Sequence, residues 1–167
     1  MSKLTLKTEG DTHVVITRHF DAPPEAVYRA HTDPEIIQKW LLGPDGWTMP
    51  VCINEAKPGG KIRYEWRHPK KGGFHVTGEY IKLQPYSRLV HVERMFLPDP
   101  TPDNHVETGF VADGTGTLMT MRMTLPDSKT RAMMLASGME HGMEDSYVRL
   151  EGMLPALSDN LPRAVNQ

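Results

Sequence analysis

The C-terminal stretch from Asp127 to Leu154 constrains the fold of this chain more than any other segment. Its large apolar residues recur at spacings of three and four; they are Leu135, Met139, Met143, Tyr147, Leu150 and Leu154. This spacing predicts that they share one face of an α-helix. Asp127 or Ser128 can cap its first turn, and Gly152 and Pro155 are typical of a helix end. At about 1.5 Å per residue this helix is roughly 40 Å long, so we expect it to lie against a sheet.

The N-terminal part of the chain predicts one strand followed by two short helices. The β-branched stretch from His13 to Phe20 favours a strand. Pro23 and Pro24 stop it and suit the first turn of a helix. Asp33 followed by Pro34 is the cap and first position of a second helix, which ends before Gly43.

From Trp47 onward the pattern indicates strands joined by short turns. We expect strands at Trp47 to Asn54, Lys61 to Arg67, Phe74 to Leu83, Arg88 to Phe96, His105 to Ala112 and Thr117 to Thr124. Short turns between successive strands require antiparallel pairing. The predicted fold class is therefore α+β, in one domain over residues 1–167, with a core at about 13–154 and tails at both ends.

Charge and cysteine content exclude several classes of partner and site. A net charge of -2 gives no basic field for nucleic acid or for a membrane surface. No apolar run approaches the roughly 18 residues of a membrane span, so we expect a cytoplasmic protein. The eight histidines include no pair spaced i, i+4, and the single Cys52 is more typical of a buried apolar residue than of a nucleophile. We expect no metal, no cofactor and no catalytic constellation.

The residues expected between the helix and the sheet are aromatic side chains and methionines. Alternation places Tyr64 and Trp66 on one strand face, and Met119, Met121 and Met123 on another. The helix would add Met139, Met143 and Tyr147. These side chains either fill an ordinary core or line a cavity that takes a small ligand, and the pattern leaves both readings open.

The strand from Arg88 to Phe96 carries the polar residues of interest. One face presents Leu89, His91, Glu93 and Met95, and the other presents Val90, Val92, Arg94 and Phe96. An inward Glu93 would have to be paired or protonated, with His91 as its partner, and general acid–base chemistry starts from that arrangement. An outward pair would simply face solvent. The pattern does not decide between the two faces.

Several local strings resemble the Activator of Hsp90 ATPase homologue 1-like family, within the START/Bet v 1-like (SRPBCC) superfamily. The matching segments are Phe20-Asp21-Ala22-Pro23, Val27-Tyr28-Arg29-Ala30, Thr32-Asp33-Pro34-Glu35, Lys39-Trp40, Gly43-Pro44, Lys57-Pro58-Gly59-Gly60-Lys61, Gly78-Glu79-Tyr80, Arg88-Leu89-Val90, Gly116-Thr117 and Gly138-Met139-Glu140 with Gly142. The resemblance implies a helix-grip fold. Such a fold is a curved antiparallel sheet of about six or seven strands wrapped round the C-terminal helix, with a cavity between them that the two short helices close.

Three functions follow from this resemblance and from the residues. The one we favour is binding of a small hydrophobic or amphipathic molecule, without catalysis, by Tyr64, Trp66, His91, Glu93, Met119, Met121, Met139, Met143 and Tyr147. An enzyme using the same cavity for hydrolase-like or cyclase-like acid–base chemistry is an alternative. The family name implies a third, a module that contacts a chaperone. The oligomeric state stays open between monomer and homodimer.

Overall fold

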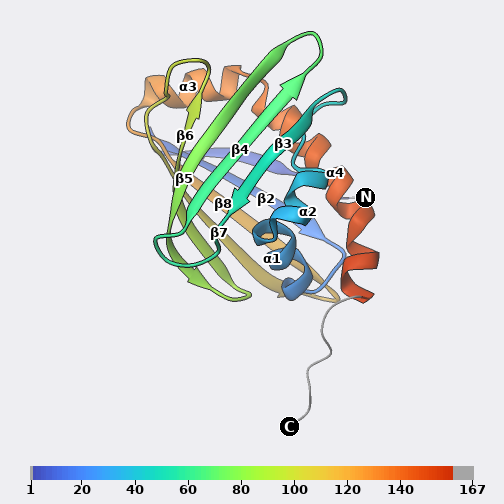
Figure 1. Cartoon of the computed structure of the whole chain (residues 1–167). Coiled ribbons are helices and arrows are strands. Elements are labelled where there is room, and N and C mark those ends of the chain that lie inside the picture. The colour runs from blue at the N-terminus through green and yellow to red at the C-terminus, as the bar shows by residue number, and fades with distance from the viewer. Residues whose placement is uncertain (1, 160–167) are drawn as a thin grey trace.

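Eight antiparallel strands form one curved sheet in the order β1-β2-β8-β7-β6-β5-β4-β3 (Figure 1). The structure, a computed structural model, describes residues 2–159. The strands are β1 (Thr5–Glu9), β2 (His13–Phe20), β3 (Thr48–Asn54), β4 (Lys61–His68), β5 (Gly72–Gln84), β6 (Arg88–Phe96), β7 (Asn104–Asp113) and β8 (Gly116–Thr124). Except for the β2–β8 pair, hydrogen-bonded neighbours follow one another in the chain, as the short turns predicted.

Within residues 2–159, four helices accompany the sheet. Helices α1 (Pro24–Thr32) and α2 (Pro34–Trp40) follow β2, and α3 (Ser128–Ala136) and α4 (Met139–Asp159) follow β8. Figure 1 shows α4, in orange and red, running along the open side of the sheet, with α1 and α2 beside it. Both short helices contact α4. The α+β class and the helix-grip arrangement expected from the sequence are therefore confirmed.

The predicted helix starts are confirmed by their hydrogen bonds. The carboxylate of Asp33 accepts a hydrogen bond of 3.0 Å from the N–H of Glu35, and Pro34 occupies the first position of α2. The carboxylate of Asp127 accepts one of 2.7 Å from the N–H of Thr130. Each cap satisfies a backbone donor that has no partner inside its helix.

The prediction of one long helix from Asp127 to Leu154 is wrong in two respects. The helix breaks at Gly138, which has a φ of +83° and so adopts the left-handed conformation that glycine accepts without strain. The second helix also continues past Pro155 to Asp159. Leu154 is fully buried and Leu157 packs against the core, so burial of this last turn outweighs the backbone hydrogen bond that proline removes.

A strand lies where an N-terminal tail was expected. Strand β1 pairs with β2, and Leu6 stands directly opposite Ile16. Its sequence has only short apolar alternation, so its formation depends on the pairing with β2 and on the packing of Leu4 and Leu6 against the core. The sheet therefore has eight strands instead of six or seven. The expected C-terminal tail, residues 160–167, lies outside the described residues.

The apolar face of α4 is buried unevenly along its length. Tyr147, Leu150 and Leu154 are at most 2% exposed. Met143 and Met139, one and two turns before Tyr147, are only partly buried, as is Leu135 on α3. The spacing favours burial of Leu135, Met139 and Met143 together with Leu150, and the structure buries only Leu150 completely.

One histidine of α1 sits between aromatic rings. The ring centroid of His31 lies 5.0 Å from that of Trp40 and 5.2 Å from that of Phe110. Its Nδ1 atom is 2.7 Å from the carbonyl oxygen of Val27, and its Nε2 atom is buried with no hydrogen-bond partner among the described residues. Burial lowers the pKa of His31 to about 4, against the opposing effect of the hydrogen bond to Val27.

The lowered pKa of His31 predicts that the protein loses stability in mild acid. Between pH 6.5 and 4 the unfolded chain takes up a proton on His31 that the folded chain refuses, so the free energy of unfolding falls as the pH falls. The loss should total about 3 kcal/mol and should level off below pH 4. Urea unfolding at a series of pH values should show this component in the parent and not in the non-titrating variant His31→Gln. Identical slopes for both proteins would contradict it.

Candidate functional site

The strand register brings the inward side chains of five strands onto one concave face. Across β4, β5 and β6, Tyr64 pairs with Val76, and Val76 with Met95. Across β6, β7 and β8, His91 pairs with Val106, and Val106 with Met123. Leu89, His91, Glu93 and Met95 therefore share the face of the buried core residues. This register decides the open question about β6 in favour of the inward orientation, because Leu89 and Val106 are at most 4% exposed.

The concave face divides into a filled part and a partly exposed part. In the filled part Phe20, Met119, Tyr147 and Leu150 are at most 2% exposed. In the other part the inward side chains are only partly buried; they are Tyr64, Trp66, His91, Glu93, Met95, Met121, Met139 and Met143, and we call this set the open half. Inward side chains of a closed core are normally buried throughout. The open half is therefore incompletely covered by the described residues.

The loop that follows α2 contacts both Trp66 of the open half and α4. Trp66 Nε1 donates a hydrogen bond of 2.7 Å to the carbonyl oxygen of Leu41. Gly43 N–H donates one of 2.8 Å to Ser146 Oγ on α4. A Cβ atom on Gly142 would meet Pro44 at 3.7 Å, which is ordinary contact. The glycine thus leaves the helix close to this loop and adds no side chain of its own between Met139 and Met143.

Aromatic rings form the wall of the open half on β4 and β5. The Tyr64 and Trp66 rings meet edge to face, with centroids 5.9 Å apart, and Trp66 stacks on Phe74 at 4.8 Å. Because Trp66 Nε1 is bonded to the carbonyl oxygen of Leu41, this indole has only apolar surface left to present to the open half.

A chain of hydrogen bonds joins two tyrosines through Asn54. Asn54 Nδ2 donates to the Tyr64 hydroxyl at 2.7 Å, and the Tyr80 hydroxyl donates to Asn54 Oδ1 at 2.9 Å. Burial raises the pKa of Tyr80 to about 12 and raises that of Tyr64 well above its usual value. Both phenols therefore stay protonated and neutral near pH 7.

His91 and Glu93 form the ionisable pair of the open half. His91 Nε2 lies 2.9 Å from Glu93 Oε1, and the two side chains are 19% and 26% exposed. An imidazole and a carboxylate at this distance can accept or donate a proton toward a bound molecule. Cys52 also faces inward, opposite Tyr64, but burial, together with the charge of Asp33, raises the pKa of its thiol to about 11. The unreactive thiol form therefore dominates at pH 7.

Sequence reasoning missed a buried arginine that joins β2 to α4. Arg18 is 2% exposed, and it donates from Nε to Glu144 Oε1 and from Nη1 to Glu151 Oε1, both at 3.1 Å. Its guanidinium also lies over the Phe20 ring, 4.8 Å from the centroid. The signal was present, because Arg18 alternates with Ile16 and Phe20 on a strand face that is otherwise apolar.

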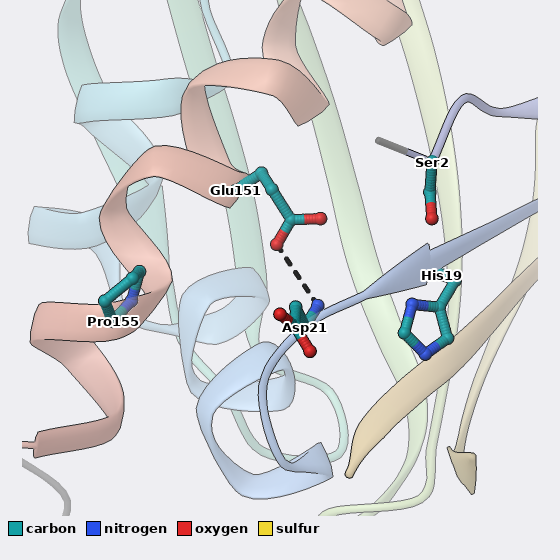
Figure 2. Close-up of a pocket in the computed structure, with 5 residues that line it drawn as sticks. All are labelled: Ser2, His19, Asp21, Glu151 and Pro155. Atoms are coloured by element: carbon teal, nitrogen blue, oxygen red, sulfur yellow. Dashed lines mark hydrogen bonds between the residues drawn. The ribbon is translucent and has the colours of Figure 1, made fainter. Parts of the chain in front are cut away.

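Two surface pockets lie away from the open half. Figure 2 shows the larger, of about 630 Å³, lined by Ser2, His19, Asp21, Glu151 and Pro155. The smaller, of about 240 Å³, is lined by Asp45, Asp145, Val148 and Arg149. None of the nine predicted binding residues lines either pocket. The Glu151 carboxylate of the larger pocket already accepts from the Asp21 N–H and from Arg18, so we assign this pocket a structural role.

The nine predicted binding residues fall into two groups. Met119 and Tyr147 are 0% and 2% exposed and belong to the filled core. The other seven, Tyr64, Trp66, His91, Glu93, Met121, Met139 and Met143, lie in the open half. Their binding of a ligand stays a prediction. Among residues 2–159, no group of three or more His, Cys, Asp and Glu side chains is placed to hold a metal ion, and no helix is long and apolar enough to cross a membrane.

A curved sheet gripping a long helix, with an incompletely filled concave face, defines a helix-grip protein of the SRPBCC type. The family model described as Activator of Hsp90 ATPase homolog 1-like protein matches residues 21–155. The chain belongs to this family. Among curated proteins none matches the chain.

Solved structures of bacterial proteins share the fold. A protein from Rhodobacter sphaeroides is 30% identical, with a TM-score of 0.86, and the match covers 92% of this chain and 99% of that one. A protein from Mycobacterium smegmatis is 20% identical at a TM-score of 0.80, with 90% and 95% covered. One from Nitrosomonas europaea is 20% identical at 0.78, with 89% and 97% covered. The last two likenesses support the fold alone.

Removal of the buried contacts of Arg18 should lower the free energy of unfolding far more than removal of an exposed ion pair. The variant Arg18→Met leaves two carboxylates, each about a fifth exposed, without their cation. We expect the free energy of unfolding to fall by about 3 kcal/mol in urea titrations. The matched control is Arg94→Met, since Arg94 and Asp103 are both about half exposed and their pair should be worth at most about 1 kcal/mol. Equal losses in the two variants would show that the buried contacts of Arg18 stabilise the fold no more than the exposed pair does.

Proposed function

We propose that the protein binds a small hydrophobic or amphipathic molecule in the open half, between the sheet and the N-terminal part of α4. The observation that carries this proposal is the partial exposure of inward aromatic and methionine side chains on a face whose other part is filled by buried side chains. Apolar surface left exposed in a concavity is the usual setting of a ligand site. Flexible thioethers also adapt to ligands of different shape.

The residues around the open half suit an apolar ligand. Tyr64 and Trp66 supply flat rings, while Met121, Met139 and Met143 supply unbranched side chains that can change rotamer. Their polar atoms are mostly engaged elsewhere, as the hydrogen bond from Trp66 to Leu41 illustrates. Affinity would therefore come mainly from burial of the ligand's apolar surface.

Acid–base catalysis in the same space is a second candidate, favoured by one observation. His91 Nε2 and Glu93 Oε1 are 2.9 Å apart on the inward face of β6. Catalysis would need a reacting group within hydrogen-bond reach of this pair. The third candidate, contact with a chaperone, rests on the family description. The large exposed apolar side chains, among them Leu97, Met133 and Val148, come from separate elements and do not single out one docking patch.

A neutral ten-carbon alcohol, decanol, provides the test of binding. Isothermal titration calorimetry should give a dissociation constant in the micromolar range, which corresponds to about 8 kcal/mol. Met143→Trp should abolish binding while the variant stays folded, because a bulky ring can occupy a real void without displacing packed neighbours.

The matched control is Val148→Trp, since Val148 is on the same helix and is 47% exposed. This variant should bind decanol as the parent does. If the parent binds no decanol and Met143→Trp loses more than about 1 kcal/mol of stability, Met143 is a core residue and the proposal fails.

A further inference from the structure

An unpaired polar atom lies on the concave face beside the open half. Asn104, the first residue of β7, is 7% exposed, and its Oδ1 atom is buried with no hydrogen-bond partner among the described residues. Such atoms are rare in folded proteins, because a buried carbonyl oxygen that loses water without gaining a donor costs free energy. Asn104 stands directly opposite Glu93 in the β6–β7 register, so the two side chains are neighbours on one face.

Glu93 adds a negative charge that no lysine or arginine offsets among the ion pairs of residues 2–159. Its Oε1 atom contacts His91 Nε2, and its side chain is 26% exposed. Burial is the main cause of the raised pKa of Tyr64, and the Glu93 carboxylate contributes to it, so this carboxylate lies within electrostatic range of the Tyr64 hydroxyl. Glu93 therefore faces the open half, and within residues 2–159 its carboxylate forms no hydrogen bond other than the one to His91.

Arg94 on β6 and Arg18 on β2 already have carboxylate partners. Arg94 follows Glu93 but points to the opposite face, where it bonds Asp103. Arg18 on the concave face is held by Glu144 and Glu151. A ligand with an anionic head would meet the charge of Glu93 without a free guanidinium to receive it.

We propose that the ligand of the open half is an amphipathic amine, whose ammonium head is received by the Glu93 carboxylate and Asn104 Oδ1. This inference rests on the proposed function and names its ligand class. An ammonium group carries three N–H donors and one positive charge, which match an unpaired amide oxygen beside a carboxylate. The apolar body then lies along Tyr64, Trp66 and the methionines.

Three ten-carbon ligands that differ in the head group test this inference. Calorimetry should be run with decylamine, decanol and decanoate, each below the concentration at which it aggregates. Decylamine should bind about tenfold more tightly than decanol, the difference expected from one charge-assisted contact, and decanoate more weakly than decanol.

Two variants locate the source of the preference. Glu93→Gln should remove the advantage of decylamine and leave the affinity for decanol unchanged, and Asn104→Leu should weaken decylamine alone. The control Glu79→Gln removes the same charge from a carboxylate that is 55% exposed and paired with Lys61, and it should keep the preference. Circular dichroism should show all three folded; if Asn104→Leu does not fold, Glu93→Gln decides the question.

The outcomes separate this inference from the proposed function. If decanol binds and decylamine has no advantage, or if Glu93→Gln keeps the advantage, the amine inference is overturned while the cavity stands. If neither decanol nor decylamine binds the parent, both proposals fail.

Discussion

The rest of the structure depends on how far the concave sheet can be covered by α4. The sheet curves around one helix, and a single helix has only one apolar face to offer. Where that face carries Tyr147, Leu150 and Leu154, these side chains meet Phe20 and the strands completely. Where it carries Met139, Gly142 and Met143, it has one missing side chain and two flexible ones. The concavity is filled at one end of the helix and left partly open at the other.

Polar contacts in the middle of α4 hold the helix in place. The Arg18 guanidinium ties β2 to Glu144 and Glu151, two carboxylates almost two turns apart on α4. Arg149 on the same helix donates to the carbonyl oxygen of Gly43 at 2.8 Å, and Ser146 accepts from the Gly43 N–H. With its middle turns, from Glu144 to Glu151, fixed on both sides, α4 can leave its first turn loosely packed without losing its position. The stability of the fold and the openness of the site therefore come from different parts of one helix.

Much of the fold could be predicted from the sequence because its signals are local. The caps at Asp33 and Asp127 and the alternation in β4 each depend on a few neighbouring residues. The break at Gly138 could not be predicted, since a glycine within a helical pattern is compatible both with continuation and with a left-handed end. Strand β1 was missed because its formation depends on pairing with β2, which is not a local property.

The site was harder to predict than the fold, for a related reason. Both faces of β6 mix apolar and charged residues, so the inward orientation of His91 and Glu93 follows from register with β5 and β7 and not from the pattern of β6 itself. Asn104 follows a proline-rich loop, where no periodicity indicates that it will be buried. The positions of such residues cannot be inferred from local sequence patterns, because they depend on pairing between strands.

The central claim is that a ligand enters the open half and not the filled core, and the methionines can report on this directly. With ¹³C-labelled methionine methyl groups, the spectrum can be followed by NMR as decanol is added. The account predicts that the methyl signals of Met121, Met139 and Met143 shift, while those of buried Met119 and of Met133, which is 66% exposed on α3, do not. Shifts confined to Met133, or no shifts at saturating decanol, would contradict it.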